Sequence, residues 1–230
     1  MKVELVSKTN GVGKYEGLSS EEIVAAIARH GVIKEDNGKL VKYLMDNAHW
    51  SPLDMINFTF EIDTSRDIGR QILRHQSLKF QEHSTRYSDR VQFEPVELRR
   101  EDKVNRQSST ETFNPPMTRF LDPWTGEDNG DAFPASVLIE QYLKDIEEFY
   151  GRLIKLGVAK ECARKILPGC LTTTMSANGT LRSWLAFLNV RCDHHAEKEI
   201  QDIAYEIGKV LENEMPGVFG QIRWREGMFM

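Results

Sequence analysis

The segment MINFTFEID, at positions 55–63, constrains the fold more than any other part of the chain. Large apolar residues alternate in it with polar or acidic ones; the apolar residues are Ile56, Phe58, Phe60 and Ile62. Successive side chains of a strand point to opposite faces, so this pattern predicts a half-buried strand. A shorter alternating run, KVELVS at positions 2–7, predicts a second strand.

Helical patterns fill much of the remaining chain. The clearest helix start is a capping box from Ser19 to Glu22, and Gly31 marks the end of that helix. Thr64 or Ser65 caps another helix directly after the strand. Further helices are predicted over 38–49, 134–157, 158–169, 180–191 and 195–214, and a strand with a turn over 171–180. These elements indicate a helix-rich α+β protein.

The segment 134–157 carries the most regular apolar stripe of the chain. Its members are Val137, Leu138, Tyr142, Ile146, Phe149, Leu153 and Ile154. Such a stripe on a helix is expected to face the core or a subunit interface. The preceding residues, about 95–134, lack periodicity and contain Pro and Gly, so we expect an irregular loop there. We expect residues 1–230 to form a single domain.

The overall charge argues against a protein that binds nucleic acid. The 230 residues carry a net charge of -5, whereas such proteins are usually basic. The three cysteines, Cys162, Cys170 and Cys192, form no CxxC pair, which is typical of a reducing compartment without disulfides or a four-cysteine zinc site. No apolar run has the length of a membrane span, and the first residues lack the apolar core of a signal peptide. We therefore expect a cytoplasmic protein that binds neither membranes nor nucleic acid.

The stretch Gln71–Tyr87, QILRHQSLKFQEHSTRY, gathers most of the candidate ligand-binding residues. It combines guanidinium, imidazole, amide, hydroxyl and carboxylate groups within a short span. A solvated charged loop is the plainer interpretation, but the interleaved Leu78, Phe80 and Tyr87 indicate a loop that is pinned to the protein. Burying so many polar groups is costly unless they bind something. The composition suits a ligand with a phosphate and a hydrogen-bonding ring edge.

Arginines in three separate segments strengthen this hypothesis. Arg74 and Arg86 flank the polar stretch, Arg164 precedes ILPG, and Arg182 and Arg191 lie on one predicted helix. Arg182 shares a helix face with positions 186 and 189, whereas Arg191 points elsewhere. A helix with ligand-binding residues on two faces suits a position between two bound molecules or two subunits. Alternatively, Arg191 simply interacts with the helix dipole at the C-terminal end.

Other chemistries receive weak support from the sequence. The adjacent residues CDHH, at 192–195, cannot converge on one metal ion without ligands from elsewhere, so no metal site is predicted. Adjacent side chains on an extended segment point in opposite directions, which disfavours a nucleophilic pair of Ser84 with His83. No cysteine has a base beside it in sequence. Neither GxGxxG nor a P-loop pattern is present, so a dinucleotide would not be held in the Rossmann manner.

The motif RHQSLKFQEHSTRY resembles the signature RHRxxSxNExSxRY of the flavin-dependent thymidylate synthases, the ThyX family. Matching residues are Arg74, His75, Glu82, Ser84, Arg86 and Tyr87, and the departures are Gln76, Lys79 and Gln81. The resemblance extends to HWSPLDMINFTFEID, NRQSS, ARKILPG and LRSWLAFLNVRCDHHAEKEIQDIA, so it covers most of the chain from about His49 to Ala204.

This resemblance implies an antiparallel sheet and a set of site residues. The implied dUMP contacts are Gln71, Arg74, Glu82, Ser84, Thr85, Arg86, Arg164 and Arg191. The implied FAD contacts are Ser51, Arg74, His75, Gln76, Glu82 and Arg182, with His49 near the flavin and the folate. Arg191 is the implied catalytic residue, placed against the uracil. Ala186 occupies the position of the family's usual Asn. This replacement, like that of Arg by Gln76, changes a residue that is expected to contact FAD.

The implied activity is the methylation of dUMP to dTMP. In this family methylenetetrahydrofolate gives the carbon, FAD reduced by NADPH gives the hydride, and no enzyme nucleophile is used. The implied assembly is a homotetramer with active sites shared between subunits. Two alternatives remain: a nucleotide-binding protein that kept the dUMP site but lost flavin chemistry, and a metal-dependent phosphohydrolase built on His75, Glu82 and His83.

Overall fold

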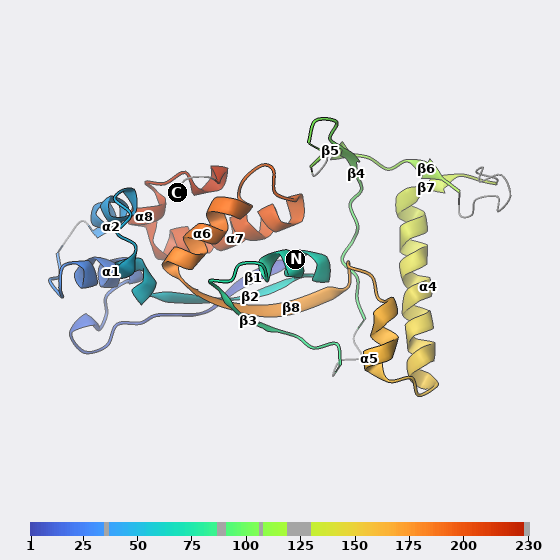
Figure 1. Cartoon of the computed structure of the whole chain (residues 1–230), viewed down its shortest axis with the longest axis horizontal. Coiled ribbons are helices and arrows are strands. Elements are labelled where there is room, and N and C mark those ends of the chain that lie inside the picture. The colour runs from blue at the N-terminus through green and yellow to red at the C-terminus, as the bar shows by residue number, and fades with distance from the viewer. Residues whose placement is uncertain (35–36, 87–90, 106–107, 119–129, 228–230) are drawn as a thin grey trace. The chain divides into compact units, whose positions relative to one another are not determined.

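The computed structural model describes residues 1–34, 37–86, 91–105, 108–118 and 130–227. It divides into two compact units (Figure 1). Unit 1 consists of Met1–His83 and Thr173–Met230, and unit 2 of Ser84–Thr172. No helix in the described part of the chain combines the length and the apolar character needed to span a membrane.

A four-stranded sheet forms the centre of unit 1. Its strands lie in the order β1 (Lys2–Lys8), β2 (Asn57–Ser65), β8 (Thr172–Thr180) and β3 (Lys79–Glu82). The outer pairs, β1 with β2 and β3 with β8, are antiparallel. Both strands predicted from alternation are therefore confirmed, and the fold is α+β with an antiparallel sheet.

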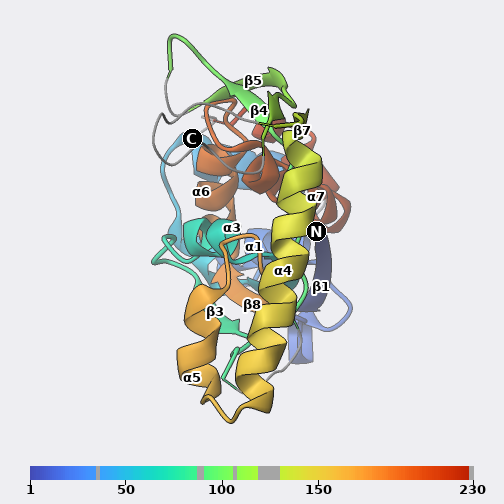
Figure 2. The same cartoon turned by 90° about the vertical axis from the view of Figure 1, so that its right-hand side faces the viewer.

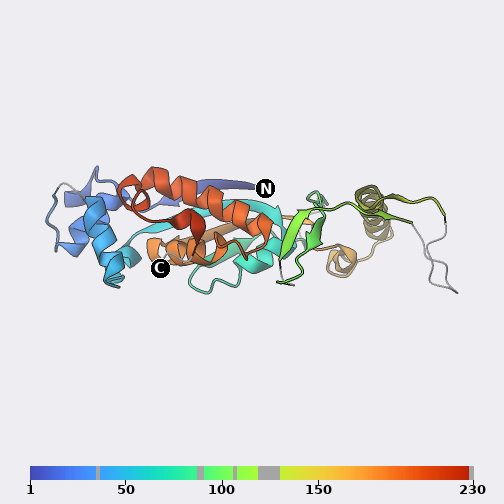
Figure 3. The same ribbon diagram turned by 90° about the horizontal axis from the view of Figure 1, so that it is seen from above.

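Two long helices cover the apolar face of this sheet (Figure 1, Figure 3). They are α6 (Leu181–Arg191) and α7 (Lys198–Glu214). The side chains of Phe58 and Phe60 on β2 are fully buried. Trp184 of α6 donates a hydrogen bond from its indole Nε1 to the Phe58 carbonyl at 3.0 Å and packs edge-on against Phe60 at 4.9 Å. The alternating pattern thus marks the centre of the core.

Smaller helices pack at one end of unit 1. They are α1 (Ser20–Ala28), α2 (Asn37–Asp46) and α8 (Pro216–Phe219), with one-turn 3₁₀ helices at Gly13–Tyr15, Ser51–Met55 and Trp224–Glu226. The predicted capping box is confirmed, since Ser19 and Glu22 exchange both of its hydrogen bonds. Gly31 follows α1 with a φ of 90°, a conformation that favours glycine.

The polar stretch contains more regular structure than a loop. Ser65 precedes the helix α3 (Arg66–Ile72), and a tight turn then leads into strand β3. The expectation of a loop was therefore wrong for 79–82, because this segment pairs with β8 across a distance that the local pattern does not reveal. The predicted turn within 171–180 was also wrong, since β8 is a continuous strand. Tyr87 lies outside the described residues.

Unit 2 contains the helix α4 (Ala135–Lys155), the short helix α5 (Lys160–Ala163) and a 3₁₀ turn at Arg164–Ile166. Figure 2 shows α4 and α5 side by side. The described part of 95–134 includes two small antiparallel pairings rather than only irregular backbone. They join β4 (Arg99–Glu101) to β5 (Ser109–Thr112) and β6 (Pro116–Met117) to β7 (Phe133–Pro134).

The apolar stripe of α4 is not part of the core of this chain. Val137, Tyr142 and Phe149 are 49%, 64% and 52% exposed. Only Ala135 and Tyr150 of this helix are buried. The core half of the expectation was therefore wrong, and a subunit interface on this helix stays a prediction.

Candidate functional site

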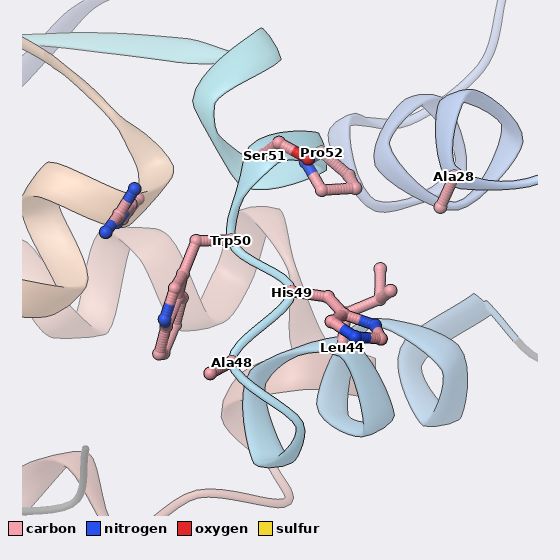
Figure 4. A pocket seen from close by; sticks show the side chains of 8 residues that line it. Ala28, Leu44, Ala48, His49, Trp50, Ser51 and Pro52 are labelled. Carbon is pink, nitrogen blue, oxygen red and sulfur yellow. The ribbon is translucent and has the colours of Figure 1, made fainter.

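Three of the sequence-predicted residues line one open pocket in unit 1 (Figure 4). His49, Ser51 and Arg182 surround a volume of about 550 Å³. The remaining lining residues are mostly apolar: Ala28, Leu44, Ala48, Trp50 and Pro52. Figure 4 shows the rings of His49 and Trp50 projecting from the segment that connects α2 to the 3₁₀ helix at Ser51–Met55.

Hydrogen bonds within and between chain segments hold this pocket together. The backbone N–H of His49 donates to the Leu44 carbonyl at 2.8 Å, which closes the end of α2. Asp54 accepts from Arg182 Nη1 at 3.3 Å and from the Thr180 hydroxyl at 3.1 Å. An ion pair thus orients Arg182, whose guanidinium lies 5.6 Å from the centre of the Trp50 ring. An aromatic face beside a fixed cation suits a planar conjugated ligand with polar substituents.

A second cluster forms around Arg191, at the end of α6. Its Nε donates to His75 Nε2 at 2.9 Å, and its Nη2 donates to the backbone carbonyl of Gln71 at 3.0 Å. The Gln71 side-chain amide in turn donates to the Glu197 carboxylate. Helix α3 supplies Gln71 and the turn after it supplies His75, so elements far apart in sequence meet here.

The electrostatics of this cluster are unusual. Burial, reinforced by the charge of Arg191, lowers the pKa of His75 to about 4, so its imidazole is neutral at pH 7. Burial and the nearby charge of Arg74 lower the pKa of Arg191. Within the described part of the chain, neither Arg74 nor Arg191 forms an ion pair with a carboxylate, and the hydrogen-bond acceptors of Arg191 are all neutral. Two uncompensated guanidiniums at one place favour the binding of an anion.

Two further predicted residues of unit 1 lie near the turn and on β3. Gln76 is exposed in the turn between α3 and β3. Glu82, at the end of β3, accepts a hydrogen bond from the hydroxyl of Thr173 on β8 at 2.9 Å. This bond orients the half-buried carboxylate and leaves its second oxygen for another donor.

The remaining predicted residues belong to unit 2. Arg164 donates from Nη1 to the Thr85 hydroxyl at 3.1 Å. Arg86 is exposed and lies 3.7 Å from the Glu161 carboxylate, a weak pairing in water. The Ser84 hydroxyl accepts from the Arg86 backbone N–H at 3.3 Å. Unit 2 therefore presents two guanidiniums and two hydroxyls, and the bond between Arg164 and Thr85 joins positions 79 apart in the sequence.

The CDHH segment forms a local turn. Asp193 accepts from both the backbone N–H and the imidazole Nδ1 of His195, each at 2.8 Å. Its carboxylate and the rings of His194 and His195 lie within 4.8 Å of one another, but both rings are exposed. Burial raises the pKa of the Cys192 thiol to about 12, so this cysteine is protonated and a poor nucleophile at neutral pH.

The sequence reasoning missed four residues that support the site. Trp50 and Asp54 build the pocket, Thr173 orients Glu82, and Glu197 binds Gln71. A tryptophan directly beside His49 is a visible signal for a ligand-facing ring. The contacts of Thr173 and Glu197 join residues 91 and 126 positions apart, so no local pattern announces them.

Comparison with known proteins places the chain in a family. The model of the Thy1 family, described as thymidylate synthase complementing protein, matches residues 13–217. The chain is 34% identical over 212 residues to the flavin-dependent thymidylate synthase of Synechocystis sp., covering 91% of this chain and 92% of that protein. It is 30% identical over 231 residues to the probable flavin-dependent thymidylate synthase of Paramecium bursaria Chlorella virus 1, covering 97% and 100%. It is 34% identical over 184 residues to the flavin-dependent thymidylate synthase of Kosmotoga olearia, covering 79% and 74%. The chain belongs to the family of flavin-dependent thymidylate synthases.

Proposed function

We propose that this protein methylates dUMP to dTMP, with methylenetetrahydrofolate as carbon donor and FAD reduced by NADPH as hydride source. The observation that carries the proposal is the uncompensated charge of Arg191 beside Arg74. A half-buried guanidinium whose acceptors in the described part of the chain are all neutral is poised for an anionic ligand. A nucleotide monophosphate, with an ionisable ring edge and a phosphate, meets this demand.

Arg191 is the residue that we propose to act on the uracil ring. Its guanidinium would stabilise negative charge at the N3 edge of the base, which makes the ring carbon C6 more electrophilic. This role requires no nucleophile from the protein. Burial raises the pKa of Cys192 to about 12, which makes this one thiol a poor nucleophile.

Each unit contains further residues that we assign to dUMP binding. In unit 1 we assign Gln71, Arg74 and Glu82 to the nucleotide in addition to Arg191. In unit 2 we assign Ser84, Thr85, Arg86 and Arg164. The guanidinium and hydroxyl groups of the second set are the donors that a phosphate prefers.

The pocket and the turn after α3 contain groups that fit a flavin. Ser51 and Arg182 lie in the pocket beside the Trp50 indole, with His49 placed near flavin and folate, while Arg74, His75, Gln76 and Glu82 supply further polar contacts. When bound, the flavin supplies the hydride. The side chains of this protein bind and orient the reactants. Gln76 and Ala186 offer fewer or weaker polar contacts than Arg and Asn, so we expect the affinity for FAD to rest on the other residues.

We further propose a homotetramer in the cytoplasm. The exposed apolar side chains of α4 supply a surface that subunit contacts would cover. All three cysteines are free, which agrees with a reducing compartment.

Titration of the purified protein with FAD tests the proposal. The visible spectrum of FAD is expected to change when it binds, and denaturation of the protein should release the flavin. Protein that binds dUMP but binds no FAD at any concentration would instead be a nucleotide-binding protein that has lost flavin chemistry.

A further inference from the structure

The bond between Arg191 and His75 determines which ring nitrogen of the histidine carries its proton. The Nε of an arginine always bears hydrogen and has no lone pair to accept with, so it can only donate. His75 Nε2, 2.9 Å away, must therefore be the acceptor. A neutral imidazole that accepts at Nε2 carries its proton at Nδ1.

The ring of His75 is held firmly enough to act as a fixed acceptor. Its backbone N–H donates to the Ile72 carbonyl at 3.0 Å, and its carbonyl accepts from Leu78 at 3.0 Å. The ring packs edge-on against the buried Phe187 of α6, with 4.8 Å between ring centres. Backbone bonds on both sides and an aromatic neighbour thus set the position of Nε2.

The guanidinium of Arg191 is thereby restrained on two edges. His75 takes the Nε–H, and the Gln71 carbonyl takes one Nη2–H. Among the residues that the structure describes, the Nη1 group has only a long contact of 3.5 Å, to the Gln71 side-chain oxygen. Nη1 and the second hydrogen of Nη2 are therefore the donors that remain for a ligand.

We propose that His75 is a positioning residue for Arg191, and that it offers its Nδ1–H to an acceptor atom of a bound ligand. The first part rests on the proposed function of Arg191. A guanidinium without the His75 acceptor can rotate about its long side chain, and the fork that faces the substrate is then no longer fixed. The second part predicts the chemistry of the ligand atom beside His75, which must be a hydrogen-bond acceptor, such as a carbonyl or phosphate oxygen or an unprotonated ring nitrogen.

Two substitutions separate positioning from simple loss of a side chain. In His75→Gln the amide oxygen replaces Nε2 as an acceptor, whereas His75→Leu has no acceptor. We expect His75→Leu to lower kcat by roughly 10²-fold, as a displaced catalytic group does, with a much smaller change in the KM for dUMP. His75→Gln should recover a measurable part of that loss. His30→Leu, at an exposed histidine of the same unit, is the matched control and should keep wild-type turnover.

Nitrogen-15 NMR of histidine-labelled wild-type protein supplies a readout that does not depend on turnover. At pH 7 the His75 signal, identified by its loss in His75→Leu, should show a protonated Nδ1 and an unprotonated Nε2. A proton on Nε2, a doubly protonated ring, or an unchanged kcat in His75→Leu would overturn the proposal. Absence of dTMP formation by wild-type protein would defeat the proposed function instead, and the spectrum would still decide the state of His75.

Discussion

Arg191 donates a hydrogen bond from Nη2 to the backbone carbonyl of Gln71 at 3.0 Å. The acceptor is a main-chain atom at the end of α3, so the contact fixes the end of α6 against that helix. No carboxylate in the described part of the chain neutralises the guanidinium. Its position is thus determined by neutral groups, while its charge stays available to a ligand.

Removal of this charge tests its role in the reaction. Arg191→Ala should lower kcat by roughly 10²–10³-fold, the usual cost of losing one donor that stabilises developing negative charge. Folding should persist, because the charge is partly desolvated and leaves no ionic partner behind among the described residues. Steady-state kinetics with circular dichroism as a folding check measure both. Arg223→Ala, whose side chain is 83% exposed in the wild type, serves as control; equal turnover in the two variants would contradict the assignment.

Ser84 distinguishes a binding hydroxyl from a nucleophile. Ser84→Ala should weaken dUMP binding roughly tenfold, equivalent to about one hydrogen bond to a charged group, and leave measurable turnover. Calorimetric titration with dUMP and a turnover assay test the two parts. Ser7→Ala on the exposed edge strand is the control. Complete loss of turnover with unchanged dUMP affinity would assign covalent chemistry to Ser84.

The low pKa of His75 predicts a specific loss of stability in acid. In the folded protein this pKa is about 4, against an ordinary value of 6.5, so between these pH values the unfolded chain binds more protons. The stability contributed by neutral His75 is therefore complete above about pH 6.5 and falls as the pH drops towards 4. Denaturant unfolding at several pH values, compared with His75→Leu, isolates this contribution. A stability difference between the two proteins that stays constant from pH 7 to pH 4 would show that His75 titrates normally.

The raised pKa of Glu21 predicts a stability that depends on pH in the opposite direction. Burial raises its pKa above the ordinary value of 4.5, although the Gly217 N–H donates to the carboxylate at 3.1 Å. Its stabilising contribution is present below pH 4.5 and lost as the pH rises through the raised pKa. Glu21→Gln keeps an acceptor without the charge, so its stability relative to wild type should be greater at pH 7 than at pH 4. The exposed Glu16→Gln provides the comparison; if both variants show the same pH dependence, burial of Glu21 is not the cause.

Local sequence patterns predicted the parts of the fold that depend on local rules. Alternation around Phe58 and the capping box at Ser19 identify β2 and α1, because side-chain period and cap chemistry act within a few residues. Strand β3 was missed, since its pairing partner lies in β8 about a hundred positions later. The apolar stripe correctly predicted that α4 has an apolar face. Periodicity alone, however, does not reveal what covers that face.

The candidate site shows the same division. The resemblance to the family was enough to propose Arg191 and His75 separately. Their direct contact joins positions 116 apart and depends on the packing of α6 against the end of α3. The pairing of Arg182 with Asp54, 128 positions apart, is likewise a product of tertiary structure.

Formation of dTMP by the purified protein is the most direct test of the account. With dUMP, methylenetetrahydrofolate, FAD and NADPH present, we predict that dTMP accumulates and that omission of FAD or NADPH stops it. Protein that binds both dUMP and FAD but forms no dTMP, or that forms dTMP without flavin, would contradict the account.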